Sequence, residues 1–146
     1  MGTIRTVAEV SAGDTLPPRT IHVDRATLVQ YAGASLDRNR IHWDERFATS
    51  VGLPDVIAHG MFTMATAVRV VTDWAGDPGA VLEYSVRFTR PVVVPDPEGA
   101  TITVAGSVRS VREDGAAEVD LTATVSGSTV LARARAVVRP RAGSGA

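Results

Sequence analysis

Asp37 and His42 are the residues of this chain best suited by type to acid–base chemistry. They lie in a polar stretch between two segments with helical patterns. Imidazole titrates near neutral pH and can act as a base, whereas a carboxylic acid can donate a proton when its surroundings favour the protonated form. Gly60 opens a long apolar segment, so its backbone N–H is expected at a helix N-terminus, where a developing negative charge is stabilised. The three groups together suit proton transfers around a carbon–carbon double bond.

The aspartate and the histidine can meet only if the chain bends between them. Asp37 and His42 are five residues apart, which places them on different sides of a helix and on opposite faces of a strand. Asn39 lies between them, and Asp and Asn both favour bends because their side chains bond to nearby backbone. We therefore predict a folded loop here. Taken alone, the two residues have an alternative interpretation: they would belong to a solvated loop with a helix cap and would take no part in catalysis.

Other polar residues near this loop have simpler interpretations. Asp44 precedes a short helical pattern and is predicted to be its N-cap. His59 is interpreted either as support for the site or as a hydrogen-bonded structural histidine. A metal site from His42, Asp44 and His59 is conceivable by residue type, but the spacing matches no known ligand pattern, so we predict no metal.

The composition limits the classes of function. The chain has 146 residues, 45% of them hydrophobic, with a net charge of −1, which argues against nucleic acid or an anionic membrane as the main partner. All 15 basic residues are arginine and there is no cysteine, which excludes lysine Schiff bases, disulfides and thiolate chemistry. No apolar run reaches membrane-spanning length and the first residues lack the apolar core of a signal peptide, so we expect a cytoplasmic protein.

The apolar periodicity predicts an α+β fold in a single domain over residues 1–146, with residues 139–146 as a flexible tail. Helices are predicted over 24–32, 44–50 and 60–74, and strands over 20–23, 82–89, 102–108, 119–125 and 130–138. The helix at 60–74 has almost no polar face and is expected to be buried on all sides. The last four strands are expected to form an antiparallel meander that wraps around this helix.

The central segment resembles the hydratase 2 motif of the MaoC-like dehydratases. Its pattern is Tyr31-Ala32-x-x-Ser35-x-Asp37-x-Asn39-x-Ile41-His42-x-Asp44, followed by Ile57-Ala58-His59-Gly60-Met61. Residues 13–17, 74–81 and 83–89 resemble the B subunit of actinobacterial (3R)-hydroxyacyl-ACP dehydratases, and the resemblance covers about residues 5 to 138. It implies a hot-dog fold, in which an antiparallel sheet wraps around a long central helix.

The resemblance also implies roles for individual residues. The family's catalytic aspartate and histidine fall on Asp37 and His42, and its backbone oxyanion donor falls on Gly60. The motif asparagine and serine fall on Asn39 and Ser35, which are expected to support the loop together with His59.

The implied activity is a hydro-lyase that interconverts (3R)-hydroxyacyl and trans-2-enoyl thioesters carried on acyl carrier protein or CoA, in fatty-acid or polyketide assembly. The phosphopantetheine belongs to the substrate, and no cofactor is expected. The implied assembly is a hot-dog dimer, as a heterodimer with a related subunit that lacks the Asp/His pair or as a homodimer. An (R)-specific enoyl-CoA hydratase of β-oxidation, a hot-dog thioesterase and a non-catalytic partner subunit are the alternatives.

Two positions depart from the family pattern. Arg40 stands where proline usually follows the motif asparagine, which predicts a looser loop and a positive charge near the mouth of the pocket. Ala65 stands where single-type (R)-hydratases often have serine, which favours the B-subunit resemblance. Neither departure affects Asp37 or His42.

Overall fold

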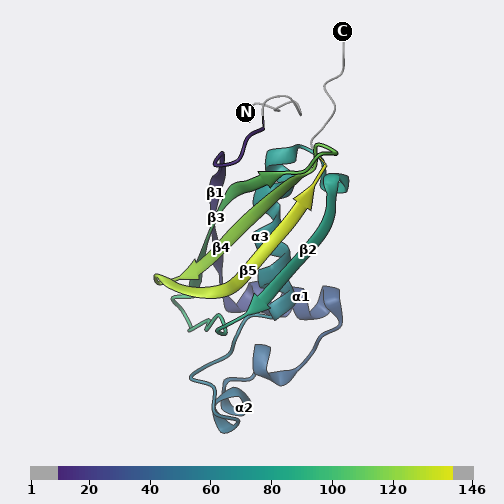
Figure 1. Cartoon of the computed structure of the whole chain (residues 1–146). Helices are drawn as coiled ribbons and strands as arrows, with labels where there is room; N and C mark the ends of the chain where they lie inside the picture. The colour runs from purple at the N-terminus through teal and green to yellow at the C-terminus, as the bar shows by residue number, and fades with distance from the viewer. Residues whose placement is uncertain (1–9, 140–146) are drawn as a thin grey trace.

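One antiparallel sheet curves around one long helix in the computed structural model, which describes residues 10–139 (Figure 1). The helices and strands in chain order are β1 (Thr15–Val23), α1 (Arg25–Ser35), the 3-10 turn η2 (Arg40–His42), α2 (Glu45–Ser50), α3 (Gly60–Ala75), the 3-10 turn η3 (Pro78–Ala80), β2 (Val81–Phe88), β3 (Ala100–Val111), β4 (Ala117–Val125) and β5 (Ser128–Val138). The α+β prediction is confirmed. Apart from Arg139, the tail predicted for residues 139–146 lies outside the described residues.

The helix boundaries follow from local capping. The Asp24 side chain accepts a hydrogen bond from the Thr27 N–H at 2.8 Å and starts α1. Asp44 caps α2 in the predicted way, with 3.1 Å to the Phe47 N–H. Helix α3 ends at Gly76, whose φ of 71° is a left-handed conformation that glycine adopts without strain.

The sheet order is β1-β3-β4-β5-β2, with antiparallel pairing throughout. Strands β3, β4 and β5 form the predicted meander, but the inclusion of β2 in it was wrong, because β2 pairs with β5 at the far edge. The connection over residues 89–99 crosses from that edge to the other side of the sheet. It passes beside residues 56–58, where Ile57 and Val93 form an isolated antiparallel bridge.

The first strand is longer than the predicted 20–23 and includes Pro17 and Pro18. Proline removes a backbone donor and is excluded from central strands, but it is tolerated at an edge and at irregularities in register. Strand β1 is an edge strand, and its register with β3 shifts between Leu16 and Arg19. The two prolines therefore fit a strand that sequence patterns alone assign to a loop.

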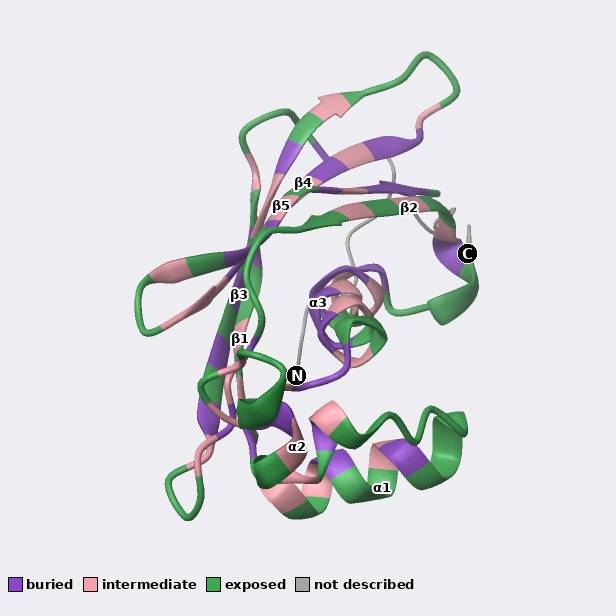
Figure 2. Cartoon of the chain, turned by 90° about the horizontal axis from the view of Figure 1, so that it is seen from below, coloured by how far each residue is buried: buried purple, intermediate pink, exposed green. Residues whose placement is uncertain are grey.

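Helix α3 lies in the concave side of the sheet, as predicted, but it is not enclosed on all sides (Figure 2). Its buried face packs against the sheet through Thr63, Thr66, Ala67, Val70, Val71 and Ala75. A stripe at four-residue spacing, Met61, Ala65, Arg69 and Asp73, is exposed, and Met61 is 60% exposed. The expectation of complete enclosure was wrong because the curved sheet covers only one side of the helix.

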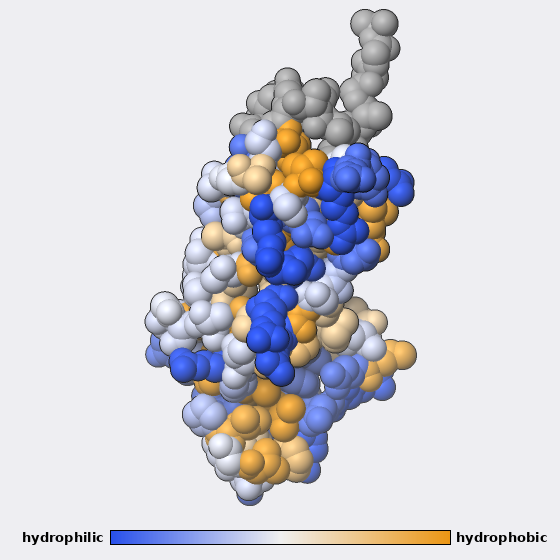
Figure 3. Space-filling view, in the orientation of Figure 1, coloured by the Kyte–Doolittle hydropathy of each residue, from blue (hydrophilic) through white to orange (hydrophobic). Residues whose placement is uncertain are grey.

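The opposite face of the sheet is polar. Hydrophilic residues gather over the strands in the view of Figure 3. Asp120 on β4 forms ion pairs there with Arg135 on β5 at 3.0 Å and with Arg109 on β3 at 4.0 Å. Among residues 10–139, no helix combines the length and the apolar character needed to cross a membrane.

Candidate active site

The loop after α1 begins with a sharp turn. Leu36, with φ of 64°, ends the helix in a left-handed conformation. The Ser35 hydroxyl donates a hydrogen bond to the Tyr31 carbonyl at 2.7 Å and accepts one from the Asp37 N–H at 3.2 Å. The serine therefore fixes the backbone at the point where Asp37 leaves the helix.

Asn39 continues the bend, as its residue type predicts. Its N–H donates to Asp37 Oδ1 at 3.2 Å, and its own side-chain oxygen accepts from the Ile41 N–H at 3.2 Å. The second bond caps the 3-10 turn η2, which ends at His42. Consecutive local bonds thus return the chain on itself between the aspartate and the histidine.

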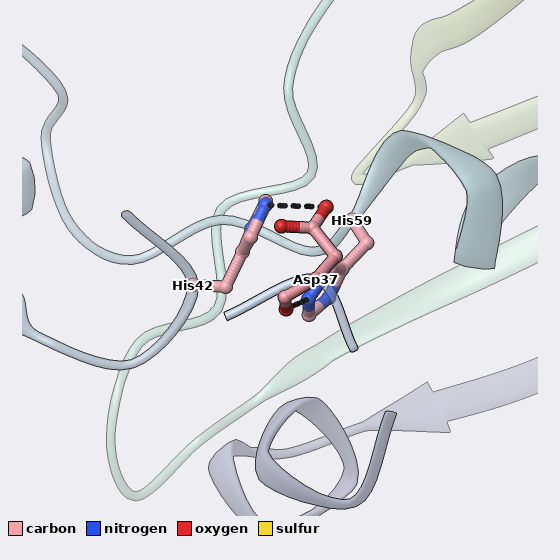
Figure 4. A group of neighbouring side chains, drawn as sticks. All are labelled: Asp37, His42 and His59. Carbon is pink, nitrogen blue, oxygen red and sulfur yellow. Dashed lines mark hydrogen bonds and ion pairs between the residues drawn. The ribbon is translucent and has the colours of Figure 1, made fainter. Parts of the chain in front are cut away.

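The bend brings the side chains of Asp37 and His42 to face each other (Figure 4). His42 Nε2 lies 3.9 Å from Asp37 Oδ2, which is beyond hydrogen-bond length but within the range of a direct electrostatic interaction. The His42 side chain is 7% exposed and the Asp37 side chain is 54% exposed. The carboxylate therefore stands at the solvent side of a buried imidazole.

The tautomer of His42 follows from its other ring nitrogen. Nδ1 lies 2.6 Å from the Ile57 carbonyl oxygen. A carbonyl oxygen can only accept, so Nδ1 carries the hydrogen and the neutral ring keeps its lone pair on Nε2, toward Asp37. Burial lowers the pKa of His42 and outweighs the opposing effect of the bond to Ile57, and neighbouring His59 also lowers this pKa. His42 is thus a neutral ring with a fixed, available lone pair.

His59 contacts both Asp37 and His42. Its ring stacks on His42 with centroids 3.7 Å apart and planes 21° apart, and Tyr31 packs against it at 4.7 Å. His59 Nε2 lies 3.0 Å from the Asp37 backbone oxygen, so Nε2 carries the hydrogen and donates it. Its Nδ1 is buried without a hydrogen-bond partner. His59 therefore fixes both members of the pair, through the backbone of one and the ring of the other.

Gly60 follows His59 and is the first residue of α3. Its N–H, in the first turn, has no intrahelical acceptor. Gly60 lines a cavity of about 310 Å³ together with Ile57, Thr63, Phe88, Arg90 and Val130, among others. A Cβ at position 60 would meet the Phe88 ring at 3.2 Å. The absence of a side chain therefore leaves this amide accessible beside the ring.

A metal site from His42, Asp44 and His59 is not assembled. Asp44 caps α2, and it is Asp37 whose ligand atom lies within 4.8 Å of those of the two histidines. The near-parallel stacking of the rings disfavours a shared ion, because the lone pair of each imidazole lies in its own ring plane. The arrangement fits proton transfer better than metal binding.

Arg40 behaves differently from the prediction. Its guanidinium pairs with Asp44 at 2.7 Å and lies 4.5 Å above the Phe47 ring, so the positive charge is directed toward α2. Through these contacts Arg40 links η2 to α2. Two parts of the site, the Ile57 carbonyl and Phe88, have no signal in the sequence pattern, because the first acts through its backbone and the second lies on a distant strand.

The sequence matches the family model of the MaoC-like domain over residues 8–127. This chain belongs to the MaoC-like family. The MaoC-like chain shares its fold with solved structures of hot-dog proteins, so the predicted family and fold are confirmed.

Two curated relatives show the range within the family. The 3-hydroxyacyl-thioester dehydratase X of Mycobacterium tuberculosis is 36% identical over 113 residues, which are 76% of this MaoC-like chain and 39% of that protein. The (R)-specific enoyl-CoA hydratase of Rhodospirillum rubrum is 30% identical over 122 residues, which are 83% of each protein. The chain thus spans less than half of the first relative and most of the second.

Two solved structures extend the comparison. A MaoC-like dehydratase superposes with a TM-score of 0.90 at 42% identity, covering 93% of this chain and 42% of that one. A chain from the ChsH1-ChsH2 complex of Mycobacterium tuberculosis superposes with a TM-score of 0.78 at 24% identity, covering 89% of this chain and 98% of that one. The second likeness shows the fold alone.

Proposed function

We propose that this MaoC-like chain is a hydro-lyase that interconverts (3R)-hydroxyacyl and trans-2-enoyl thioesters on acyl carrier protein or CoA. The observation that carries the proposal is the pairing of a fixed, neutral His42 Nε2 with the Asp37 carboxyl group at 3.9 Å. The names of the two curated relatives agree with it, since one is a dehydratase of 3-hydroxyacyl thioesters and the other an enoyl-CoA hydratase.

In dehydration, His42 Nε2 takes the proton from the α-carbon of the thioester, and the Gly60 N–H stabilises the enolate-like oxygen that forms. Protonated Asp37 then gives its proton to the β-hydroxyl, the carbon–oxygen bond breaks and water leaves. The pair ends with its proton on His42, and transfer back to the neighbouring Asp37 restores the starting state. Hydration is the reverse sequence, in which ionised Asp37 orients and deprotonates water. These steps require no metal or redox group.

We place the substrate in the cavity beside Gly60, whose lining also includes Ile57, the residue whose carbonyl holds His42. Its apolar lining, which includes Val92 and Val130, suits an acyl or pantetheine chain. Arg90 lines the same cavity and offers a positive charge to a phosphate at the carrier end.

We also propose that a second hot-dog chain completes the site. Strand β2 lies at the edge of the sheet, and Leu82 and Phe88 on it are exposed, as is Met61 on α3. Pairing through β2 would cover these apolar side chains and enclose the cavity beside Phe88. The ChsH1-ChsH2 complex, one chain of which shares this fold, is itself an assembly of two proteins, which agrees with the proposal. The cytoplasmic location stays a prediction.

The test is hydration of crotonyl-CoA, followed by loss of the enoyl-thioester absorbance, with the chain alone and with any hot-dog partner that co-purifies from the native host. Each of H42A and D37N is expected to lower kcat/KM by about a hundredfold or more. His22→Gln on β1 and Asp77→Asn, in which the new amide oxygen can still accept from the Gly79 N–H, are the matched controls. Full activity in both site variants would favour an assembly subunit without catalysis, and release of free thiol would favour a thioesterase.

A further inference from the structure

Arg25, the first residue of α1, lies outside the candidate site but connects three segments around it. Its Nε donates a hydrogen bond to the Val94 carbonyl at 2.8 Å. Its terminal nitrogen forms an ion pair with Asp55 at 2.6 Å and approaches Glu45 of α2 at 3.4 Å. The Arg25 side chain is only 23% exposed and that of Asp55 is 19% exposed. A half-buried ion pair with an added hydrogen bond is more rigid than the exposed pairs on the outer face of the sheet.

Asp55 begins the segment that carries most of the site. Its Oδ1, which binds Arg25, also accepts the N–H of Val56 at 2.7 Å. Two residues further along, the Ile57 carbonyl holds His42 Nδ1. His59 and Gly60 then follow directly. A displacement of Asp55 therefore moves the group that orients the base and the amide that would bind the oxyanion.

The same segment pairs with residues 92–94 of the crossing connection. The Val94 N–H donates to Val56 at 2.9 Å, and the Ala58 N–H donates to Val92 at 2.8 Å. Arg25 binds Asp55 on one of these two segments and the Val94 carbonyl on the other, so its guanidinium links the two segments at one end. Only the planar fork of arginine reaches both acceptors at once, and a lysine ammonium is a single point donor.

We propose that Arg25 is a positioning residue for the reaction, which rests on the proposed function: it fixes residues 55–60 so that the Ile57 carbonyl holds His42 with Nε2 free and the Gly60 amide in place. Arg25 touches neither the Asp37 nor the His42 side chain, so its effect reaches them only through the backbone. Small displacements of reacting groups are costly, and about 1 Å can lower a rate a hundredfold.

The test compares Arg25→Gln and Arg25→Lys with Arg135→Gln, which breaks the ion pair with Asp120 on the outer face of the sheet. For Arg25→Gln we expect a fall in kcat of about tenfold to a hundredfold, with KM changed less than about threefold, measured where the variant is fully folded. Arg25→Lys is expected to recover part of kcat, because it keeps the Asp55 pair. Arg135→Gln is expected to retain kcat.

NMR of the His42 ring provides a second readout that a loss of stability alone would not move. In the unsubstituted chain Nδ1 carries the hydrogen. In Arg25→Gln we expect a mixture of tautomers and a pKa moved up toward the ordinary histidine value, because lost burial outweighs the lost bond to Ile57. The titratable groups facing His42 are Asp37 and His59, and neither is changed in this comparison.

Asp55→Asn weakens the same ion pair by changing its acidic partner, and it replaces Arg25→Gln in the test if that variant fails to fold. Substitutions of both partners together are expected to cost little more than one alone, because they remove one shared interaction. Unchanged kcat and an unchanged His42 ring in the folded variants would overturn the proposal. A changed ring in a chain without hydratase activity would support the positioning by Arg25 and overturn only the proposed reaction.

Discussion

Gly60→Ala should separate the activity of this protein from its stability. Residue 60 begins α3 with a φ that alanine adopts freely, and alanine favours a helix over glycine by up to about 1 kcal/mol. The new Cβ would lie 3.2 Å from Cε1 and Cζ of Phe88, so that ring must move by a few tenths of an ångström. Phe88 is exposed at the end of an edge strand, where a small movement costs less than overpacking in a core. The free energy of unfolding is therefore expected to change by no more than about 1 kcal/mol.

The same methyl group stands beside the amide proposed as the oxyanion donor. Alanine keeps this N–H, but its methyl group would stand in the way of a thioester oxygen that approaches it. Losing the use of one such donor typically costs about a hundredfold to a thousandfold in rate, so kcat/KM for crotonyl-CoA should fall by at least about a hundredfold. The measurements are urea unfolding and steady-state kinetics on the same preparation. Adding Phe88→Ala tests whether the displaced ring is responsible, and we expect no recovery. A folded Gly60→Ala variant within about threefold of full activity would refute the idea that the substrate oxygen must pass the position of this methyl group to reach the amide.

Three further predictions concern the surroundings of the pair. Burial lowers the pKa of His42, so between that lowered value and the ordinary histidine pKa of about 6.5 the unfolded chain binds more protons than the folded one. The stability contributed by this group should therefore be lost as the pH falls from about 6.5 through the folded pKa, and His42→Gln should weaken this dependence in urea unfolding at a series of pH values. Tyr84→Phe removes a hydroxyl that donates to the Met64 carbonyl of α3 at 2.7 Å, and should lower the free energy of unfolding by about 1 kcal/mol with kcat unchanged; a large loss of kcat would place Tyr84 in the site. Arg40→Pro restores the family motif at the first position of η2 and loses an exposed ion pair with Asp44, so thermal unfolding should show a stability change within about 1 kcal/mol and activity should be retained; a collapse of activity would show that the loop depends on this arginine.

The parts of the site that could be predicted from sequence are those made by local hydrogen bonds. Asp, Asn and Ser bond to backbone within a few residues, so the bend from Ser35 through Asn39 follows from residue type. The Ile57 carbonyl could not be found in this way, because every residue has a carbonyl and only the fold selects one. The stacking of His59 on His42 likewise depends on a long-range approach of two segments.

The fold shows the same division between local and distant effects. Alternation of apolar residues located β2, β3, β4 and β5 within a few residues, because each strand has one face against α3. The order of the strands in the sheet was harder to predict, since periodicity indicates which face of a strand is buried and not which strands pair with each other. The crossing connection over residues 89–99 determines the strand order, because it separates β2 from β3. It also brings Val92 and Val94 against the segment that holds His42.

The incomplete burial of α3, which the sequence pattern did not predict, bears on the proposed assembly. Its composition predicted burial on every side, yet the structure leaves Met61 exposed. The Asp37 side chain in the loop before it is half-exposed as well. An apolar residue at the surface of a helix, beside an exposed edge strand, fits a surface that another chain covers. Covering it would exclude bulk water from the site and so strengthen the electrostatic interactions within it. The sequence pattern of α3 therefore agrees with the proposed assembly, in which a second chain would supply the enclosure that one sheet does not.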